Sequence, residues 1–225
     1  MGTFSPNPHG DRRRVRIGLL GGSFNPAHEG HRHVAELALK RLGLDQVWLL
    51  VSPQNPLKPV AGMASQQERL ASARAALAGN PRLLATDIET SLGTRYTADT
   101  LSKLKLRFPK VRFVWLMGAD NLVQISRWAR WTRIFQAVPV AILARSPYSQ
   151  RALAARAARR LSGFRVRDRA APGLADRQPP AWVFLHTRLH PASATAIRAR
   201  RNVEPGNVVA GRIVDPTSVV EGASP

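Results

Sequence analysis

Two histidines stand three residues apart at the end of the stretch GGSFNPAHEGH, residues 21–31. Residues three apart lie on one face of a helix, so a helix that begins near Pro26 would bring His28 and His31 together in its first turn. Imidazole N–H groups can donate hydrogen bonds to the charge that develops on a transferring phosphate. The stretch therefore predicts a site for phosphate chemistry.

The residues before the histidines also fit an anion. Gly21 and Gly22 carry no side chains where a backbone could approach a ligand closely, and a helix start offers unbonded N–H groups and a positive dipole end. The spacing matches neither GxGxxG nor GxxxxGK[ST]. Two alternatives stay open at this point. The histidines could bind zinc, although the stretch lacks a glutamate in HExxH register and the chain has no cysteine, or they could be core residues.

Alternating segments along the chain would position this stretch. Apolar runs predict strands at 15–20, 47–51, 82–88, 111–117, 139–143 and 182–185. Helical spacing predicts helices at 28–42, 65–77, 97–108, 151–161 and 193–201, with short helical pieces after 117–120. Ser65 is expected to cap its helix, with Glu68 at the capping-box position. This alternation predicts an α/β fold, a doubly wound, Rossmann-like and mostly parallel sheet with helices on both faces, which binds ligands beyond the carboxyl ends of its strands.

The whole chain sets further limits. Its 225 residues suit one domain, and we expect a flexible tail over 1–13, a single domain over 14–201 and a C-terminal tail of uncertain structure over 202–225. The absence of cysteine excludes disulfides and thiolate ligands, and no apolar run approaches the ~20 residues that span a bilayer. The charged N-terminus is not followed by a signal-peptide core, so we expect a cytoplasmic protein without a membrane partner.

The chain is strongly basic, with 34 Lys and Arg against 14 Asp and Glu and a formal charge of +20. Such a charge suggests polyanionic partners such as nucleotides or nucleic acid. An equally open interpretation is that the arginines reflect genome composition and lie on solvated faces. The Arg-rich segment 151–169 would carry a nucleic-acid-binding function, but no RNA-binding signature accompanies it, and we do not expect nucleic acid as a partner.

Four motifs, in order, resemble those of one family. GGSFNPAHEGH is similar to the GGxFxPxHxGH signature of nucleotidyltransferases, whose HxGH core is also found in class I aminoacyl-tRNA synthetases. RYTADTL at 95–101, MGADNL at 117–122 with RW at 127–128, and SATAIR at 193–198 resemble further segments of bacterial nicotinate mononucleotide adenylyltransferases. The matches extend from about residue 15 to 201, so the chain as a whole resembles this family.

The resemblance implies a reaction. The adenylyl group of ATP would pass to nicotinate mononucleotide, giving nicotinate adenine dinucleotide and pyrophosphate in NAD biosynthesis, without a covalent enzyme intermediate. The implied cofactor is Mg²⁺ bound through the substrate phosphates, and we expect no metal site made by the protein. Nicotinamide mononucleotide or pantetheine phosphate remains an alternative acceptor, and the oligomeric state stays open.

The resemblance also implies roles for individual residues. The catalytic set is His28, His31 and Arg198. The ATP-binding set is Gly21, Gly22, Ser23, Phe24, Gly118, Asp120, Ser193 and Thr195. The mononucleotide-binding set is Asn55, Lys58, Thr97 and Trp128. From the residues alone, Asp120 could equally cap a helix and Trp128 could belong to the core, while the backbone of Gly93 is expected to donate to the nicotinate carboxylate.

Overall fold

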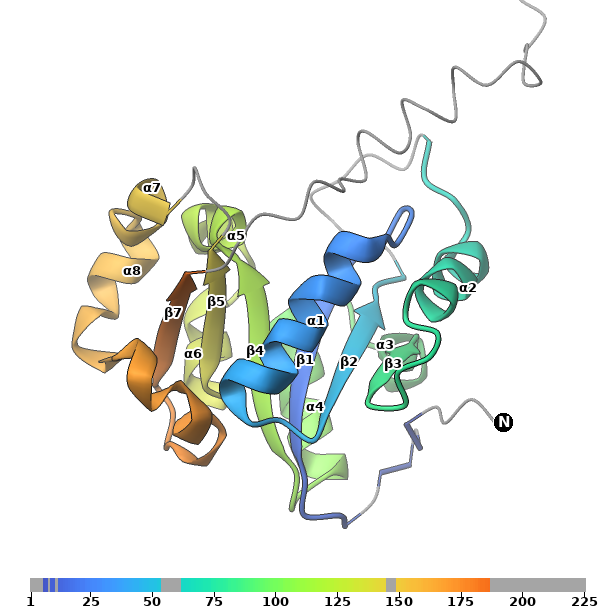
Figure 1. Cartoon of the computed structure of the whole chain (residues 1–225), viewed down its shortest axis with the longest axis horizontal. Coiled ribbons are helices and arrows are strands. Elements are labelled where there is room, and N and C mark those ends of the chain that lie inside the picture. The colour runs from blue at the N-terminus through green and yellow to red at the C-terminus, as the bar shows by residue number, and fades with distance from the viewer. Residues whose placement is uncertain (1–5, 8, 11, 54–61, 145–148, 187–225) are drawn as a thin grey trace, which may run out of the picture.

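Seven parallel strands form the centre of the molecule in the computed structural model of the chain, which describes residues 6–7, 9–10, 12–53, 62–144 and 149–186 (Figure 1). The strands are β1 (Arg16–Gly22), β2 (Gln46–Val51), β3 (Leu83–Thr86), β4 (Arg112–Gly118), β5 (Val140–Ala144), β6 (Arg165–Val166) and β7 (Trp182–His186). They lie in the order β3-β2-β1-β4-β5-β7-β6, and each neighbouring pair is parallel. The predicted doubly wound α/β fold is confirmed.

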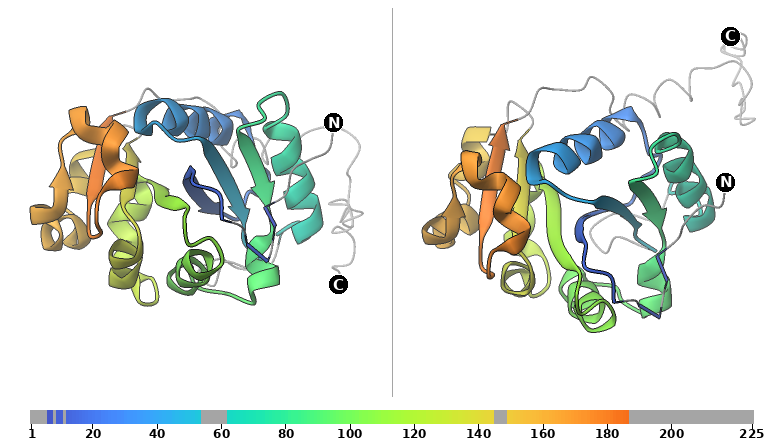
Figure 2. Two further views of the ribbon diagram at one scale, coloured as in Figure 1. Left: turned by 90° about the horizontal axis from the view of Figure 1, so that it is seen from below. Right: turned by 60° about the horizontal axis from the view of Figure 1, so that its bottom comes forward.

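Helices cover both faces of this sheet. They are α1 (Glu29–Leu42), α2 (Gln66–Ala76), α3 (Ile88–Leu92), α4 (Thr97–Arg107), α5 (Ala119–Gln124), α6 (Trp131–Ala137), α7 (Ser149–Leu153) and α8 (Arg156–Arg160), with 3₁₀ segments η1 (Ile125–Arg127), η2 (Ser162–Phe164) and η3 (Asp168–Asp176). Helices α1 and α2 and the segment η3 lie on one face, and α3 to α6 lie on the other (Figure 2). Their buried side chains join two separate hydrophobic clusters. No described helix is long and apolar enough to cross a bilayer.

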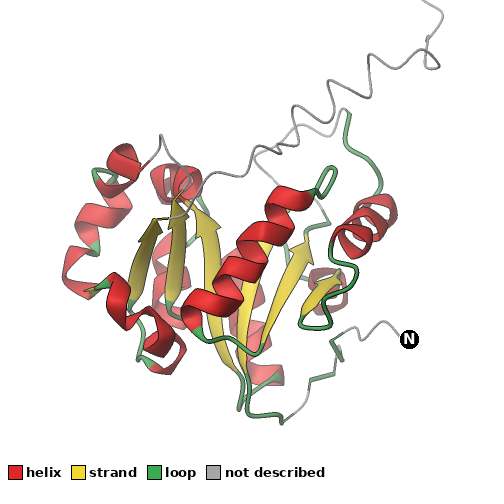
Figure 3. Ribbon diagram, viewed as in Figure 1, coloured by secondary structure: helices red, strands yellow, loops and turns green. Residues whose placement is uncertain are grey.

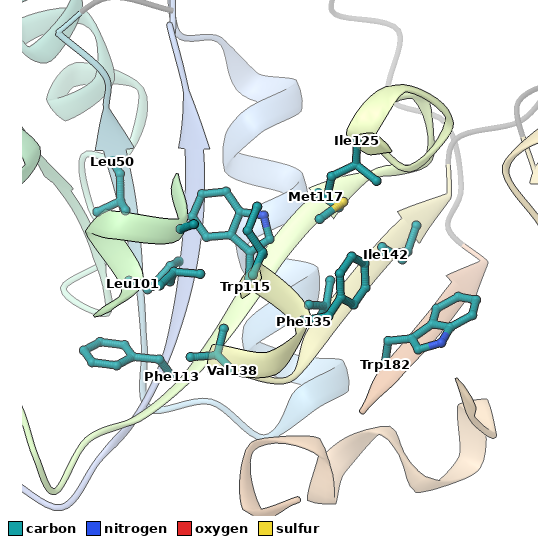
Figure 4. Close-up of a cluster of buried hydrophobic side chains, with 14 of the residues drawn as sticks. Leu50, Leu101, Phe113, Trp115, Met117, Ile125, Phe135, Val138, Ile142 and Trp182 are labelled. Atoms are coloured by element: carbon teal, nitrogen blue, oxygen red, sulfur yellow. The ribbon is translucent and has the colours of Figure 1, made fainter. Parts of the chain in front are cut away.

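All strands except the two-residue β6 send alternate side chains toward two separate cores. On β4, Trp115 and Met117 join the core beneath α4 and α6, whereas Val114 and Leu116 join the core beneath α1 (Figure 4). Because both faces of a parallel sheet are covered by helices, both sets of alternate positions are buried. This explains why the strands are continuous apolar runs in the sequence.

Most predicted elements are confirmed with ends that shift by a few residues. Ser65 caps α2, and Glu68 completes the capping box as predicted. The predicted strand 82–88 is shorter, because the chain turns after Thr86, whose Oγ1 accepts a 3.2 Å hydrogen bond from the N–H of Ile88, and α3 follows.

The region after β5 differs most from the prediction. The single helix predicted over 151–161 is two helices, because Ala155 has an extended backbone, with φ −65° and ψ 153°, between α7 and α8. Neither β6, which has two residues, nor η3, which contains Pro172, was predicted, since neither is long or regular enough to give a periodic pattern. The predicted helix 193–201 lies outside the described residues, and the domain boundaries stay a prediction.

The direction in which successive strands are added to the sheet reverses between β1 and β4, although all strands stay parallel. The chain passes outward from β1 to β2 and β3, returns to β4 on the other side of β1, and continues outward to β5. Leu20 lies beside Leu116, so the carboxyl ends of β1 and β4 lie side by side, and the loop after β1 and the start of α5 lie at this end of the sheet (Figure 3). Doubly wound folds bind their ligands at such a switch point.

Candidate active site

His28 and His31 form a capping box at the start of α1. The helix begins at Glu29 and not near Pro26, so His28 is its N-cap, with φ −154° and ψ 170°. Nδ1 of His28 accepts from the N–H of Gly30 at 3.1 Å, and Nδ1 of His31 accepts from the N–H of His28 at 3.2 Å. The ring centroids are 3.9 Å apart, which agrees with the predicted pairing of the two rings.

This cap fixes the tautomer of both rings. A ring nitrogen that accepts a hydrogen bond carries no proton, so the neutral imidazole holds its proton on Nε2. Both rings therefore present an Nε2–H donor, and His28 is held rigidly because it is only 7% exposed. Donors fixed before the reaction are the groups that stabilise charge on a phosphate. Neither histidine is only a core residue, because both bond the backbone at the helix start.

The two glycines of the same stretch accommodate aromatic rings. A Cβ on Gly21 would lie 2.4 Å from the Cη2 atom of Trp115, and one on Gly22 would lie 3.1 Å from the ring of Phe24. Phe24 has a φ of +47°, is 3% exposed, and packs edge-on against His31 with 5.0 Å between centroids. Packing against Trp115 therefore gives Gly21 a structural reason of its own, and the expectation that the two glycines serve close backbone approach to a ligand stays a prediction.

Asp120 lies at the end of β4, on the other side of the switch point. The N-cap of α5 is Gly118, with no side-chain cap bond, so the alternative that Asp120 caps this helix is wrong. A Cβ on Gly118 would lie 2.2 Å from Oδ1 of Asp120, so the glycine leaves room for the carboxylate to lie back over the strand end. Asp120 is exposed and is able to accept hydrogen bonds from hydroxyl groups.

Thr97 and Trp128 lie on the face that carries α4. Thr97 is the first residue of α4, whose N-cap makes no side-chain cap bond. Trp128 packs on the core but stays partly exposed, and its buried indole N–H has no acceptor among the described residues. Trp128 thus packs on the core with one part of its ring and is exposed with another.

The expectation that the backbone of Gly93 donates to the nicotinate carboxylate is wrong. Gly93 is the C-cap of α3, and its N–H donates to the carbonyl of Thr90 at 3.0 Å.

Comparison with known proteins agrees with this geometry. The cytidylyltransferase-like family model matches residues 19–200. A probable nicotinate-nucleotide adenylyltransferase of Gluconacetobacter diazotrophicus is 56% identical over 84% of this chain and 88% of its own length, and one of Parvibaculum lavamentivorans is 53% identical over 83% and 92%. The chain belongs to the nicotinate-nucleotide adenylyltransferase family.

A solved structure shows the same fold. The Plasmodium falciparum nicotinic acid mononucleotide adenylyltransferase complexed with NaAD superposes with a TM-score of 0.62 at 15% identity, covering 82% of this chain and 83% of that one. The structure of the same Plasmodium protein complexed with APC gives a TM-score of 0.60. The sheet whose switch point lies beside His28 and Asp120 therefore has the same fold as this solved structure.

Five of the residues expected to act in this adenylyltransferase lie outside the described part of the chain. They are Asn55, Lys58, Ser193, Thr195 and Arg198. Their roles stay predictions. Within the described residues, no three His, Cys, Asp or Glu side chains gather where they could hold a metal ion.

Sequence reasoning missed a buried carboxyl group, that of Glu89 on α3, which forms a hydrogen bond with α4. Glu89 is 8% exposed, and its Oε1 lies 2.9 Å from Oγ1 of Thr100, which is also 2.9 Å from Oγ1 of Thr94. Burial raises the pKa of Glu89 to about 7, against the opposing effect of the hydrogen bond with Thr100. The network braces the turn that leads into α4. The only sequence signal was an acid between the apolar positions Ile88 and Leu92.

Arg69 is the second residue that was missed. It lies in the first turn of α2, is 2% exposed, and donates hydrogen bonds to backbone carbonyls of the loops after β1 and β2. An arginine within a helix is normally read as a solvated residue, and nothing in the motif comparison singled it out.

Proposed function

We propose that the chain transfers the adenylyl group of ATP to nicotinate mononucleotide, giving nicotinate adenine dinucleotide and pyrophosphate in NAD biosynthesis. The observation that carries the proposal is the pair of imidazoles after β1 whose Nδ1 atoms accept from backbone N–H groups, which leaves the proton of each neutral ring on Nε2. They lie at the switch point of the sheet, in a chain that is 50–56% identical to several probable nicotinate-nucleotide adenylyltransferases. The cytoplasmic location stays a prediction.

The reaction asks for positioning more than for covalent chemistry. A phosphate oxygen of the mononucleotide attacks the α-phosphorus of ATP, and the bond from that phosphorus to the oxygen bridging to the β-phosphate breaks as pyrophosphate leaves. His28 and His31 would donate from Nε2 to the oxygens on which negative charge grows. No proton has to leave either ring, so the preset tautomer serves the whole step.

The remaining ATP contacts are assigned by position. Gly21 and Gly22 at the end of β1, with Ser23 and Phe24 of the loop that follows, would face the phosphates. Gly118 leaves room for Asp120 to accept hydrogen bonds from the ribose hydroxyls. From the segment outside the described residues, Arg198 would hold the β- and γ-phosphates with Ser193 and Thr195, because a guanidinium fork matches phosphate oxygens.

The acceptor would bind between the starts of α4 and α6. The unbonded N–H groups at the start of α4, beginning with Thr97, suit a carboxylate, and Trp128 would stack on the pyridine ring. Asn55 and Lys58, from the loop after β2, would approach the mononucleotide phosphate. A carboxylate pocket built of donors disfavours an amide, whose NH₂ leaves those donors unpaired.

Magnesium fits this site as an ion carried by the substrates. Among the described residues, the groups at the switch point are imidazole and backbone N–H groups, which do not ligate a cation, and the carboxylate of Asp120, so phosphate oxygens and water would supply most of the ligands of Mg²⁺. When bound, the ion would neutralise phosphate charge and make the α-phosphorus more electrophilic.

One assay tests the proposal. Purified protein is mixed with ATP, MgCl₂ and one of three acceptors, nicotinate mononucleotide, nicotinamide mononucleotide or pantetheine phosphate, and pyrophosphate release is followed. We expect the highest kcat/KM with nicotinate mononucleotide. A preference for either of the other acceptors, or equal use of the two mononucleotides, would contradict the assigned acceptor.

A further inference from the structure

Arg69 is a buried cation without an acidic partner among the described residues. At 2% exposure its guanidinium is removed from water, and burial lowers its pKa, although an arginine stays protonated. Burying a charge is costly unless hydrogen bonds compensate. Here the compensation comes from backbone carbonyls. Nε donates to the carbonyl of Ala64 at 3.0 Å, Nη1 to those of Ser23 at 2.7 Å and Ser52 at 2.9 Å, and Nη2 to that of Pro53 at 3.1 Å.

These carbonyls belong to three separate segments. Ser23 lies in the loop after β1 that leads to the paired histidines, Ser52 and Pro53 open the loop after β2, and Ala64 lies just before α2. The loop after β2 is the one that continues to the predicted acceptor residues. A single side chain thus ties the predicted ATP loop to the predicted acceptor loop.

Hydrogen bonds between uncharged groups also join the loop after β1 to the residues after β2 and before α2. Ser52 donates from its backbone N–H, at 3.0 Å, and from Oγ, at 3.2 Å, to the carbonyl of Gly22. Asn25 donates from Nδ2 to the carbonyl of Gly62 at 3.1 Å and accepts from the N–H of Ala64 at 3.2 Å. Arg69 nevertheless reaches all three segments at once, because its planar group offers five N–H donors in a fixed fork.

We propose that Arg69 is a positioning residue that fixes the loop after β1 relative to the loop after β2, so that the acceptor phosphate meets the α-phosphorus of ATP in line. The proposal rests on the proposed function. Its physical reason is that an in-line displacement tolerates little misplacement, and an error of about 1 Å can cost ~10²-fold in rate. Loss of the fork should therefore slow the chemical step more than it weakens either substrate alone.

The test replaces Arg69 with lysine, which keeps the charge and loses the fork. Arg74→Lys is the matched control, because Arg74 is exposed on the same helix. We expect kcat of Arg69→Lys to fall by ~10²-fold, while the KM of each substrate and the calorimetric affinity for ATP alone change by less than about threefold. The Arg74→Lys variant should match the unmodified enzyme.

Two results would overturn the positioning role. One is an unchanged kcat per folded molecule in Arg69→Lys, which would make Arg69 a residue of stability alone. The other is a loss of ATP affinity as large as the loss of kcat, which would show that Arg69 supports ATP binding and does not position the two loops relative to each other.

Ser52→Ala keeps the proposal testable if the lysine variant does not fold. It removes only the Oγ contact to Gly22, and we expect a smaller fall in kcat, ~10-fold, again with single-substrate affinities retained; an unchanged kcat in this variant would argue against loop positioning. The unmodified enzyme is assayed first. If it releases no pyrophosphate with nicotinate mononucleotide, the proposed function fails, and if it turns over while Arg69→Lys turns over equally well, only the positioning role fails.

Discussion

The two substrate sides of the proposed site are held by different kinds of polar contact. On the ATP side, His28 and His31 bond backbone N–H groups at the start of α1. On the acceptor side, side chains bond one another around the buried carboxyl of Glu89, which braces the turn before α4. The first arrangement fixes the orientation of two imidazoles, and the second buries a carboxyl group whose pKa is raised to about 7. Substitutions on the two sides should therefore differ in kind as well as in size.

The largest effect should follow His31→Ala. We expect kcat to fall by ~10²-fold or more, because removing one preset donor to transition-state charge costs about 2.7–4 kcal/mol. Part of the cap is also lost, which costs about 1 kcal/mol of folding stability. Steady-state kinetics and thermal unfolding separate the two effects, with His33→Ala on the same helix as the control. A folded His31→Ala enzyme with near-normal turnover would remove His31 from the catalytic set.

Glu89→Gln should change how stability depends on pH. The unfolded chain releases this proton near pH 4.5, whereas the folded protein keeps it to a pKa of about 7, so the folded state binds more protons in between. The stability of the unmodified protein should thus fall as pH rises through this window, by up to about 3 kcal/mol from this group.

Glutamine keeps an acceptor for Thr100 and cannot ionise. Urea unfolding at pH 5 and pH 8 should show that the fall is smaller in Glu89→Gln than in the unmodified protein. Glu36→Gln, in a partly exposed ion pair with Arg32, serves as the control. Parallel pH dependences in the unmodified protein and Glu89→Gln would show that Glu89 ionises freely in the folded state.

Trp128→Ala tests the acceptor surface directly. We expect KM for the mononucleotide to rise far more than KM for ATP, because one stacking contact is worth about 1–3 kcal/mol by analogy with bases on aromatic rings. Measuring both KM values decides the assignment. Equal effects on the two substrates would move Trp128 from the pocket to the core, where its ring already packs.

Gly21→Ala should act on stability. The new Cβ would lie 2.4 Å from Trp115, and such overpacking costs about 1–3 kcal/mol. Gly163→Ala is the control, because nothing lies within 4 Å of its Cβ position. In a Trp115→Phe background the cost should shrink. If Gly21→Ala left stability intact but abolished ATP binding, close backbone approach to the ligand would be the reason for the glycine.

The sequence was informative where contacts are local. The buried strands, the cap at Ser65 and the pairing of His28 with His31 all depend on spacings of a few residues. The roles of Gly21 and Arg69 depend on partners brought together by the fold, namely Trp115 from β4 and the carbonyl of Ser23. No pattern within one segment reports such partners. The break between α7 and α8 was missed for another reason, since the Ala/Arg run contains no residue that normally ends a helix.

The imidazole caps limit which side chains this helix start can accept. An asparagine at position 28 places its amide near Nδ1 and could still cap α1, but it would present nothing where Nε2–H now lies. A glutamine reaches the place of Nε2 and leaves the N–H of Gly30 without its acceptor. Serine, threonine and aspartate, the usual caps, have no N–H donor to offer at the place of Nε2. Only an imidazole carries an acceptor nitrogen for the backbone and a donor nitrogen for a substrate in one ring, so substitution of His28 is limited by two independent requirements.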